Sequence, residues 1–126
     1  MLLFVYGSLM KHAPNHYVIA QQAKFVAQGT IRAVLYDLGI GFPGAIEDKN
    51  AEGVYGEVYE LPDSELEGLD QFEGCDPVDK ANSLYYRKIT EVTTFKKETL
   101  KAWVYFLVPS RLKTFTSEKI TGGRWQ

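Results

Sequence analysis

The sequence has 126 residues, of which 45% are hydrophobic and 24% are charged, and its formal net charge at pH 7 is −2. This composition is typical of a globular protein, and the length predicts one domain, residues 1–126, that buries a core without metal or disulfide staples. Acidic and basic residues are interspersed and no lysine or arginine cluster stands out. We therefore expect no nucleic-acid partner.

The chain has one cysteine, Cys75, which excludes an internal disulfide and favours a reducing, cytoplasmic location. The apolar run from Leu2 to Tyr6 is too short for the core of a signal peptide, and no run reaches the length of a membrane span. We expect no membrane partner, and the composition leaves the oligomeric state open.

The run from Leu2 to Tyr6 predicts a buried strand that ends abruptly at Gly7 and Ser8. Glycine allows the chain to turn where a side chain would clash. A strand that ends in such a tight loop leaves several backbone N–H groups unpaired, and these can bind an anion or a developing oxyanion. The alternative is a plain turn without a functional role.

The two histidines, His12 and His16, lie four residues apart, which on one helix can be a metal-binding spacing. Pro14 lies between them and argues against a continuous helix there. We therefore expect solvated histidines and no metal site. A short helix is predicted over residues 16–23, with an inward face formed by Tyr17, Ile19 and Ala20.

The middle of the chain predicts mainly strands. Two strand pieces are expected within residues 23–37, with Gly29 marking a bend or a bulge between them. Residues 38–44 contain three glycines and a proline and predict a loop, which lacks the glycine spacing of nucleotide-binding loops. A further strand is expected over residues 54–61, where Gly56 marks a close backbone approach.

A second helix is predicted to start at residues 62–64 and to end at Gly74. Ser64 and Glu67 have the spacing of a capping box. The apolar face of this helix is expected to consist of Leu66, Leu69 and Phe72.

Glu73 lies seven residues after Leu66, which places it within about 20° of that leucine around the helix. The carboxylate should therefore point into the protein, where acidic groups are either paired or functional. The spacing leaves two interpretations open: an ion pair with Arg87 or Lys88, or a functional acid.

After a polar loop over residues 75–83, two more strands are predicted, over residues 84–93 and 100–108, and the second is the most apolar of the chain. The tail after Pro109 is polar. Strands thus dominate with two short helices, which indicates an α+β fold.

Several motifs together resemble the gamma-glutamylcyclotransferase-like superfamily. Val5-Tyr6-Gly7-Ser8-Leu9 looks like its substrate loop, and Leu69-Asp70-Gln71-Phe72-Glu73-Gly74 looks like its conserved helix end. Tyr86-Arg87 and Ala102-Trp103-Val104-Tyr105 resemble two of its strands. The resemblance extends to about Val108, and the loop over residues 75–83 is longer than the family pattern.

The resemblance implies a small mixed β-barrel-like sheet with a few flanking helices, and an enzyme that needs no cofactor or metal. Its substrate would be a small γ-glutamyl amide of the gamma-glutamylamine or related type. The α-amine would attack the γ-carbonyl to form 5-oxoproline and release an amine or amino acid, with Glu73 as general acid/base. The sequence leaves open whether the leaving group is a free amino acid, a lysine side chain or another amine. The substrate-binding residues would be Tyr6, Gly7, Ser8, Leu9 and Tyr105.

Proton transfer from an α-ammonium group, with a pKa of about 8, to an ordinary glutamate, with a pKa of about 4.3, is uphill by roughly 5 kcal/mol. Desolvation of Glu73 would raise its pKa and reduce this gap. Two alternatives remain. A hydrolase with Ser8 as nucleophile would need a base, which the spacing of His12 and His16 does not provide. A non-catalytic barrel that binds a small molecule or a partner protein would use the same fold.

Overall fold

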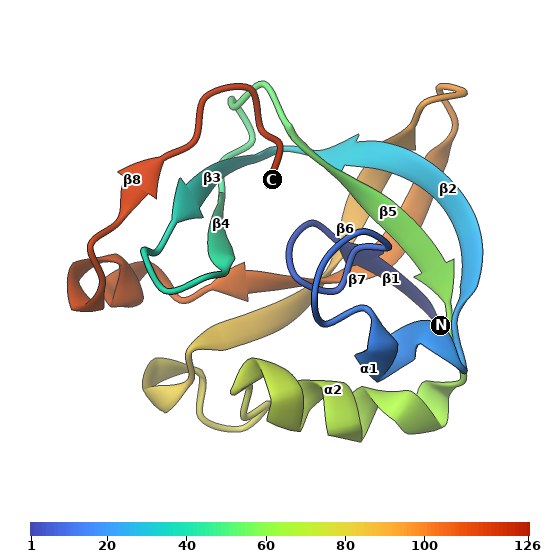
Figure 1. Cartoon of the computed structure of the whole chain (residues 1–126), viewed down its shortest axis with the longest axis horizontal. Coiled ribbons are helices and arrows are strands. Elements are labelled where there is room, and N and C mark those ends of the chain that lie inside the picture. Colours follow the sequence, from blue (N-terminus) through green and yellow to red (C-terminus); the bar gives the residue numbers. More distant parts are fainter.

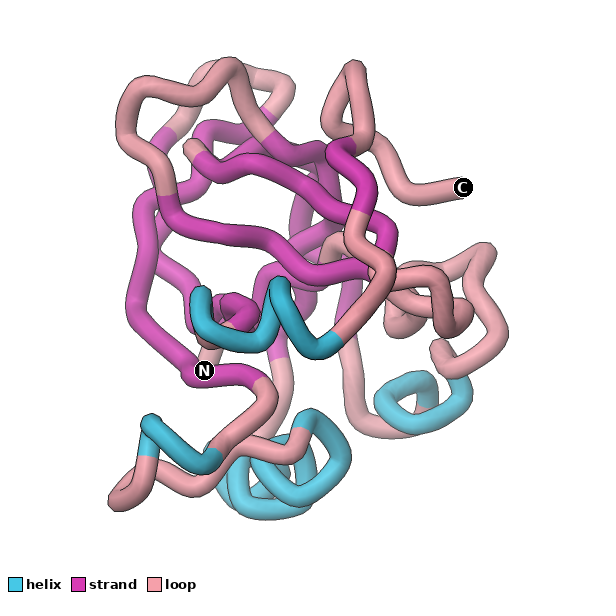
Figure 2. The backbone as a smooth tube through the Cα atoms, turned by 90° about the vertical axis from the view of Figure 1, so that its left-hand side faces the viewer, coloured by secondary structure: helices cyan, strands magenta, loops and turns pink.

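The computed structural model describes residues 1–126, which form a closed β-barrel with a smaller sheet beside it (Figure 1). The barrel has the strand order β1-β5-β2-β6-β7, and the three-stranded sheet has the order β4-β3-β8. The helical segments lie outside the ring of strands, in the lower half of the view in Figure 2. The predicted α+β fold, a barrel-like sheet with few short helices, is confirmed.

The strands are β1 (Leu2–Val5), β2 (Lys24–Ile31), β3 (Ala33–Asp37), β4 (Pro43–Glu47), β5 (Val54–Glu60), β6 (Tyr85–Thr94), β7 (Thr99–Leu107) and β8 (Glu118–Lys119). The helices are α1 (Tyr17–Ala20) and α2 (Leu66–Glu73), and the short 3₁₀ segments are η1 (Asp63–Glu65), η2 (Lys80–Asn82) and η3 (Pro109–Thr114). No helix is long and apolar enough to span a membrane.

Strand β1 is buried on both sides, which explains its unbroken apolar run. Leu3 and Val5 contribute to one hydrophobic cluster, whereas Phe4 belongs to a second cluster on the other side of the strand. Successive side chains of a strand point to opposite faces, so a strand between two cores has no polar face. Strand β7 follows the same rule, with Tyr105 in the first cluster and Phe106 in the second. Strands β1 and β7 therefore lie between the two hydrophobic clusters, at the centre of the molecule.

Gly56 and Gly29 both mark places where two strands approach too closely for a side chain. A Cβ atom at Gly56 would lie 2.3 Å from the carbonyl oxygen of Val5, which confirms the predicted close approach. A Cβ atom at Gly29 would lie 2.7 Å from the carbonyl oxygen of Thr93. The interpretation of Gly29 as a bend between two strand pieces is therefore wrong, because this residue pairs within β2.

The remaining strand predictions differ from the structure only in detail. The break between β2 and β3 falls at Arg32, and the irregularity in β2 falls between Phe25 and Ala27. Pro43 and Gly44 were expected in a loop but belong to β4, where they pair with β3. Gly44 lies against Leu107 of β7, because a Cβ atom there would be 2.9 Å from the Leu107 Cβ. The small sheet thus packs directly on the barrel.

Helix α1 is shorter than predicted, and only Ile19 of its expected inward face is buried. Tyr17 is 74% exposed and Ala20 is also exposed, because at about 100° per residue Tyr17 points away from the buried Ile19 and Ala20 points to the side. His16 is not a solvated histidine. Its Nδ1 lies 2.8 Å from the carbonyl oxygen of Leu9, and its ring packs against Tyr59.

Helix α2 ends as predicted at Gly74, whose φ of 63° is left-handed. Its start differs from the prediction, since the 3₁₀ turn η1 precedes it and Ser64 makes no capping hydrogen bond. The apolar face is narrower than expected: Leu69 is buried, but Phe72 is 42% exposed.

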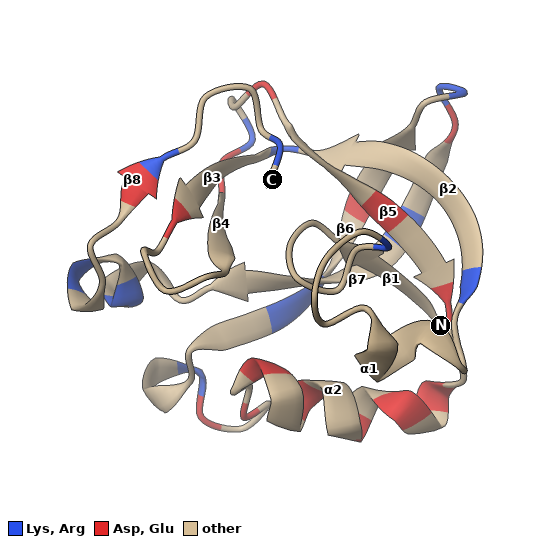
Figure 3. Cartoon of the chain, in the orientation of Figure 1, with Lys and Arg blue, Asp and Glu red and all other residues tan.

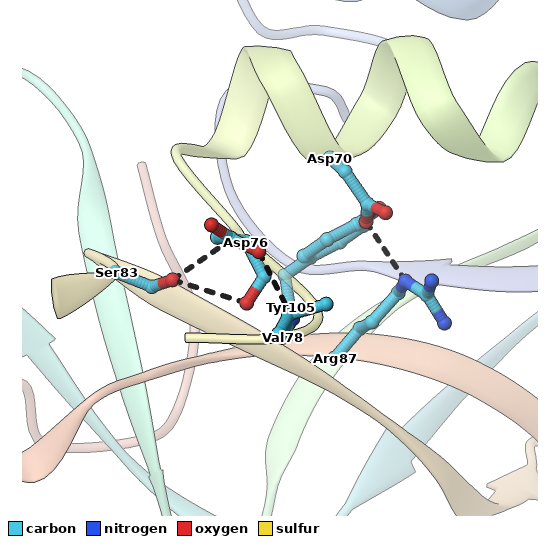
Figure 4. A network of polar contacts seen from close by, with 6 residues as sticks. All are labelled: Asp70, Asp76, Val78, Ser83, Arg87 and Tyr105. Atoms are coloured by element: carbon cyan, nitrogen blue, oxygen red, sulfur yellow. Dashed lines mark hydrogen bonds and ion pairs between the residues drawn. The ribbon is translucent and has the colours of Figure 1, made fainter. Parts of the chain in front are cut away.

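Asp70 joins α2 to the barrel, as Figure 4 shows. Its Oδ1 accepts a hydrogen bond of 2.8 Å from Arg87 Nε and one of 2.7 Å from the Tyr105 hydroxyl. The Arg87 guanidinium also lies over the ring of Trp103. The side chains of Asp70 and Arg87 are only 10% and 19% exposed, so water screens this ion pair weakly.

Breaking this pair should destabilise the protein strongly. Asp70→Asn leaves Arg87 without its counter-charge in a largely buried position, and we expect the free energy of unfolding to fall by about 3 kcal/mol. Lys88→Gln is the matched control, because it breaks the exposed pair with Glu47 and should cost less than about 1 kcal/mol. Urea denaturation of both variants at pH 7 measures the difference. Equal losses would show that the Asp70 pair does not anchor α2.

Candidate active site

A cavity of about 410 Å³ opens between the loop that follows β1 and the end of α2. This volume lies within the range of small-molecule sites. All six residues that the sequence singled out line this one cavity: Tyr6, Gly7, Ser8, Leu9, Glu73 and Tyr105. Residues more than 60 positions apart in the chain thus meet at one place.

The loop after β1 presents three free backbone donors. The N–H groups of Gly7, Ser8 and Leu9 donate no hydrogen bond within the protein. Their loop is nevertheless held in place, because the carbonyl oxygens of Gly7 and Ser8 accept hydrogen bonds from Met10 and Asn15. Consecutive free donors in a fixed loop can bind a carboxylate or stabilise an oxyanion.

Glu57 of β5 supports this loop from a buried position. Its Oε1 accepts a hydrogen bond of 2.8 Å from the Lys11 N–H and one of 2.9 Å from the Tyr59 hydroxyl. Tyr59 in turn packs against His16, which lies within hydrogen-bonding distance of Leu9. The loop therefore keeps its shape through contacts behind it, and its N–H groups remain available.

Gly7 is required by space and not by an unusual backbone angle. Its φ is not in the left-handed region. A Cβ atom at this position would lie 2.8 Å from Cγ and 2.9 Å from Cδ of Pro43, inside normal contact distance. The loop and the start of β4 can approach so closely only because this residue has no side chain.

The Ser8 hydroxyl makes no hydrogen bond in the structure, and His16 is engaged with the carbonyl oxygen of Leu9. A nucleophilic serine needs a base within hydrogen-bonding reach. The structure therefore gives no support to a serine hydrolase that uses Ser8 with His12 or His16. No group of three or more histidine, cysteine, aspartate or glutamate side chains is placed to hold a metal ion.

Glu73 is the one acidic side chain in the cavity lining, and it has no hydrogen bond or ion pair. The interpretation of Glu73 as a partner of Arg87 or Lys88 is wrong, because Arg87 pairs with Asp70 and Lys88 pairs with Glu47. Desolvation raises the pKa of Glu73 to about 7. A carboxyl group with such a pKa can accept and return a proton near neutral pH.

Three tyrosines form much of the buried wall, and each hydroxyl is committed to the protein. Tyr6 donates to the carbonyl oxygen of Tyr105 at 2.6 Å, and Tyr85 donates to that of Pro43 at 2.6 Å. Tyr105 donates to Asp70. Burial raises the pKa of all three hydroxyls above the ordinary value. They therefore stay neutral and shape the wall with their rings.

The loop over residues 75–83 joins two residues that line the cavity, Gly74 and Leu84, contributes none of its own to the lining, and is held by its own hydrogen bonds. The buried Ser83 hydroxyl accepts a hydrogen bond from the Asp76 N–H at 2.8 Å and donates to the carbonyl oxygen of Asp79 at 2.9 Å. The Asp76 carboxylate accepts the Val78 N–H, as Figure 4 shows. These contacts fix the position of Leu84, which lines the cavity.

Sequence reasoning missed Pro43 and Tyr85 as parts of the cavity wall. Both were assigned to structural elements with no role in a site. Tyr85 carried a weak signal, because it starts the strand whose next two residues belong to the family resemblance. Pro43 carried an equally weak signal, because Pro43-Gly44 falls in the expected order of the family resemblance, but its place in the wall depends on the packing of β4 on the barrel.

The comparisons with known proteins place the chain in one family. A family model described as "Gamma-glutamyl cyclotransferase, AIG2-like" matches residues 3–126. YkqA of Bacillus subtilis, provisionally named a gamma-glutamylcyclotransferase, is 32% identical over 126 residues, which are 99% of this chain and 41% of YkqA. This chain therefore spans less than half of YkqA.

A relative of similar size is MJ1514 of Methanocaldococcus jannaschii, also provisionally named a gamma-glutamylcyclotransferase. It is 30% identical over 105 residues, which are 82% of each chain. The crystal structure of an AIG2-like protein from Mus musculus matches the fold with a TM-score of 0.73 at 22% identity, covering 99% of this chain and 87% of that one. With the family model matching almost the whole length, the chain belongs to the AIG2-like gamma-glutamyl cyclotransferase family.

Proposed function

We propose that the chain is a cyclotransferase that cleaves a γ-glutamyl amide into 5-oxoproline and an amine, with Glu73 as general base and general acid. The observation that carries this proposal is that an unpaired, desolvated Glu73 faces the same cavity as the free N–H groups of Gly7, Ser8 and Leu9. The family relationship supports the reaction class.

In the first step, Glu73 takes a proton from the α-ammonium group of the glutamyl moiety. With a pKa of about 7 for Glu73 and about 8 for the ammonium group, this transfer is uphill by only about 1.4 kcal/mol. An ordinary glutamate would face roughly 5 kcal/mol. Desolvation of Glu73 thus removes most of the cost of generating the neutral amine.

In the second step, the neutral α-amine attacks the γ-carbonyl carbon of the same molecule. The carbonyl oxygen becomes an oxyanion, which the loop N–H groups stabilise. The oxyanion then collapses, the bond from the γ-carbon to the leaving nitrogen breaks, and Glu73 returns its proton to that nitrogen. The ring nitrogen still carries one proton too many, and this proton passes through Glu73 to the released amine, which leaves as an ammonium ion. The ring closure is intramolecular, so the enzyme needs only to hold one conformer with the reacting atoms about 3 Å apart.

Product analysis tests the reaction class. Purified protein incubated with a panel of γ-glutamyl amides should release 5-oxoproline and the free amine, because the α-amine and not water is the nucleophile. Chromatography with standards of both products measures this outcome, and EDTA should leave the rate unchanged. Release of free glutamate would mean hydrolysis, and release of neither product across the panel would favour the binding-only alternative.

Replacing Glu73 tests the assigned base. Glu73→Gln keeps the size of the side chain but cannot accept a proton, so kcat should fall by about 10²–10⁴-fold. In the parent protein, kcat/KM should rise as Glu73 loses its proton near pH 7. A folded Gln variant with near-parent turnover would remove Glu73 from the mechanism.

The same variant has a stability signature with a definite sign. The folded-state pKa of Glu73 is raised to about 7, above an unfolded value of about 4.3, so the folded protein binds more protons between these limits and loses stability as pH rises through them. Glu73→Gln lacks this loss and should gain stability relative to the parent over that window, by at most about 4 kcal/mol. The gain is smaller where the cavity admits water. Thermal melting at pH 4, 6 and 8 checks it.

The loop is tested by a pair of neighbouring substitutions. Gly7→Val places carbon atoms where the Pro43 ring lies, so the loop must shift and its N–H groups lose alignment. We expect kcat/KM to fall by at least about 10²-fold, the cost typical of a lost oxyanion donor. Ser8→Ala removes a hydroxyl that makes no hydrogen bond and should stay near the parent. Complete inactivity of a folded Ser8→Ala protein would instead indicate a nucleophilic serine.

A further inference from the structure

The solvent exposure of the lining side chains distinguishes the mouth of the cavity from its floor. Phe4, Tyr6, Tyr85 and Tyr105 are buried and form the floor. The large apolar lining residues that keep contact with solvent must lie at the mouth, and they are Phe42, Phe72 and Leu84. Neutral polar residues, Asn15 and Gln71, complete this rim.

Phe72 is the least expected member of the rim. It is 42% exposed and lies on the helix turn that carries Glu73. Packing does not require an apolar residue at this position, so a polar one could occupy it. An aromatic ring at the mouth of a site provides contact area for an apolar ligand group. Phe42 lines the same cavity from the loop before β4, so two aromatic side chains from distant segments contribute to its lining.

The glutamyl moiety of the substrate occupies the groups of the cavity that can pair with a charge. The cavity lining has one ionisable carboxyl, that of Glu73, and no lysine, arginine or histidine. The α-ammonium group of the substrate faces Glu73, and the α-carboxylate has only the backbone N–H groups of residues 7–9 to bind. A third charge would enter without a partner, and desolvating an unpaired charge is costly.

The surroundings disfavour a negative charge most. The segment from Asp63 to Glu73 carries five acidic residues and no basic one, and Figure 3 marks their positions along α2 in red. Asp63 is paired with the amino group of Met1 and Asp70 with Arg87, so three of the five have no ion pair. Glu73 itself ionises near neutral pH. A carboxylate on the leaving group would find no cationic side chain in the cavity lining, so an amino acid is a poor leaving group here.

From this rim and this charge count we propose that the substrates are γ-glutamyl amides of uncharged, apolar amines, whose apolar group contacts Phe42, Phe72 and Leu84. The inference rests on the proposed cyclotransferase function and adds the class of the leaving amine. Amines with a carboxylate are the poorest leaving groups, and amines with a second ammonium group lie between the two.

Four γ-glutamyl amides test the inference: the benzylamide and three para-substituted benzylamides of nearly equal size, which carry a carbamoyl, a carboxy or an aminomethyl group. The first two should have kcat/KM values at least about 10-fold above that of the carboxy compound, since an unpaired charge is disfavoured in the cavity. The aminomethyl compound should be intermediate. The carbamoyl compound controls for the size of the added group.

Phe72→Lys gives the reciprocal test. It places a cation at the mouth and should raise the kcat/KM ratio of the carboxy compound to the carbamoyl compound by at least about 10-fold. A ratio within one protein cancels any effect of the new charge on Glu73. Val78→Lys is the control, because Val78 is 95% exposed and does not line the cavity. That control should leave the ratio unchanged.

The outcomes separate the two proposals. If the protein turns over these amides but prefers the carboxy or aminomethyl compound, the leaving-group inference is overturned and the cyclotransferase function stands. If it turns over none of them but does turn over other γ-glutamyl amides, the leaving-group inference is overturned and the cyclotransferase function stands. If it turns over no γ-glutamyl amide, the proposed function fails, and calorimetric dissociation constants of the same four compounds decide the preference of the cavity. Equal or tighter binding of the charged compounds would then overturn the inference as well.

Discussion

The unpaired carboxyl group of Glu73 is the constraint on which the rest of the site depends. A carboxyl group that is removed from water without a counter-charge disfavours its own ionisation, and this raises its pKa toward 7. The carboxyl group stays unpaired because the fold directs the nearby cations to other carboxylates. Arg87 is held by Asp70 and Lys88 by Glu47, so neither neutralises Glu73.

Two acidic residues one helix turn apart thus have opposite roles in α2. Asp70 is fixed by a guanidinium group and a tyrosine hydroxyl, which anchors the helix on β6 and β7. Glu73 lies beyond this anchor and points into the cavity without a partner. The paired carboxylate keeps the helix in place, and a fixed helix end keeps the unpaired carboxyl group at a defined position. The position of the unpaired Glu73 carboxyl group therefore depends on the paired Asp70 carboxylate.

Sequence patterns predicted the features of the fold that depend on neighbouring residues alone. The helix that ends at Gly74 follows from spacing and from the preference of glycine for left-handed angles, and the strand before Gly7 follows from its apolar run. The choice between the two open interpretations of Glu73 could not be made from spacing. It depends on which carboxylate Arg87 reaches, and both lie on the same helix, three residues apart. The burial of Phe72 was predicted wrongly for a related reason. A helical wheel gives the direction of a side chain, but it does not show whether another element covers that side chain.

The shape of the cavity depends on contacts that no local pattern contains. Gly7 lies against Pro43, and Gly44 lies against Leu107, so two glycines far apart in the sequence let β4 approach both the loop after β1 and strand β7. The carbonyl oxygen of Pro43 then accepts the Tyr85 hydroxyl, which closes the floor of the cavity. A side chain at either glycine would push the small sheet outward and admit water beside Glu73. The desolvation that sets the pKa of Glu73 is therefore a property of the packing between the two sheets, and not of the helix that carries the residue.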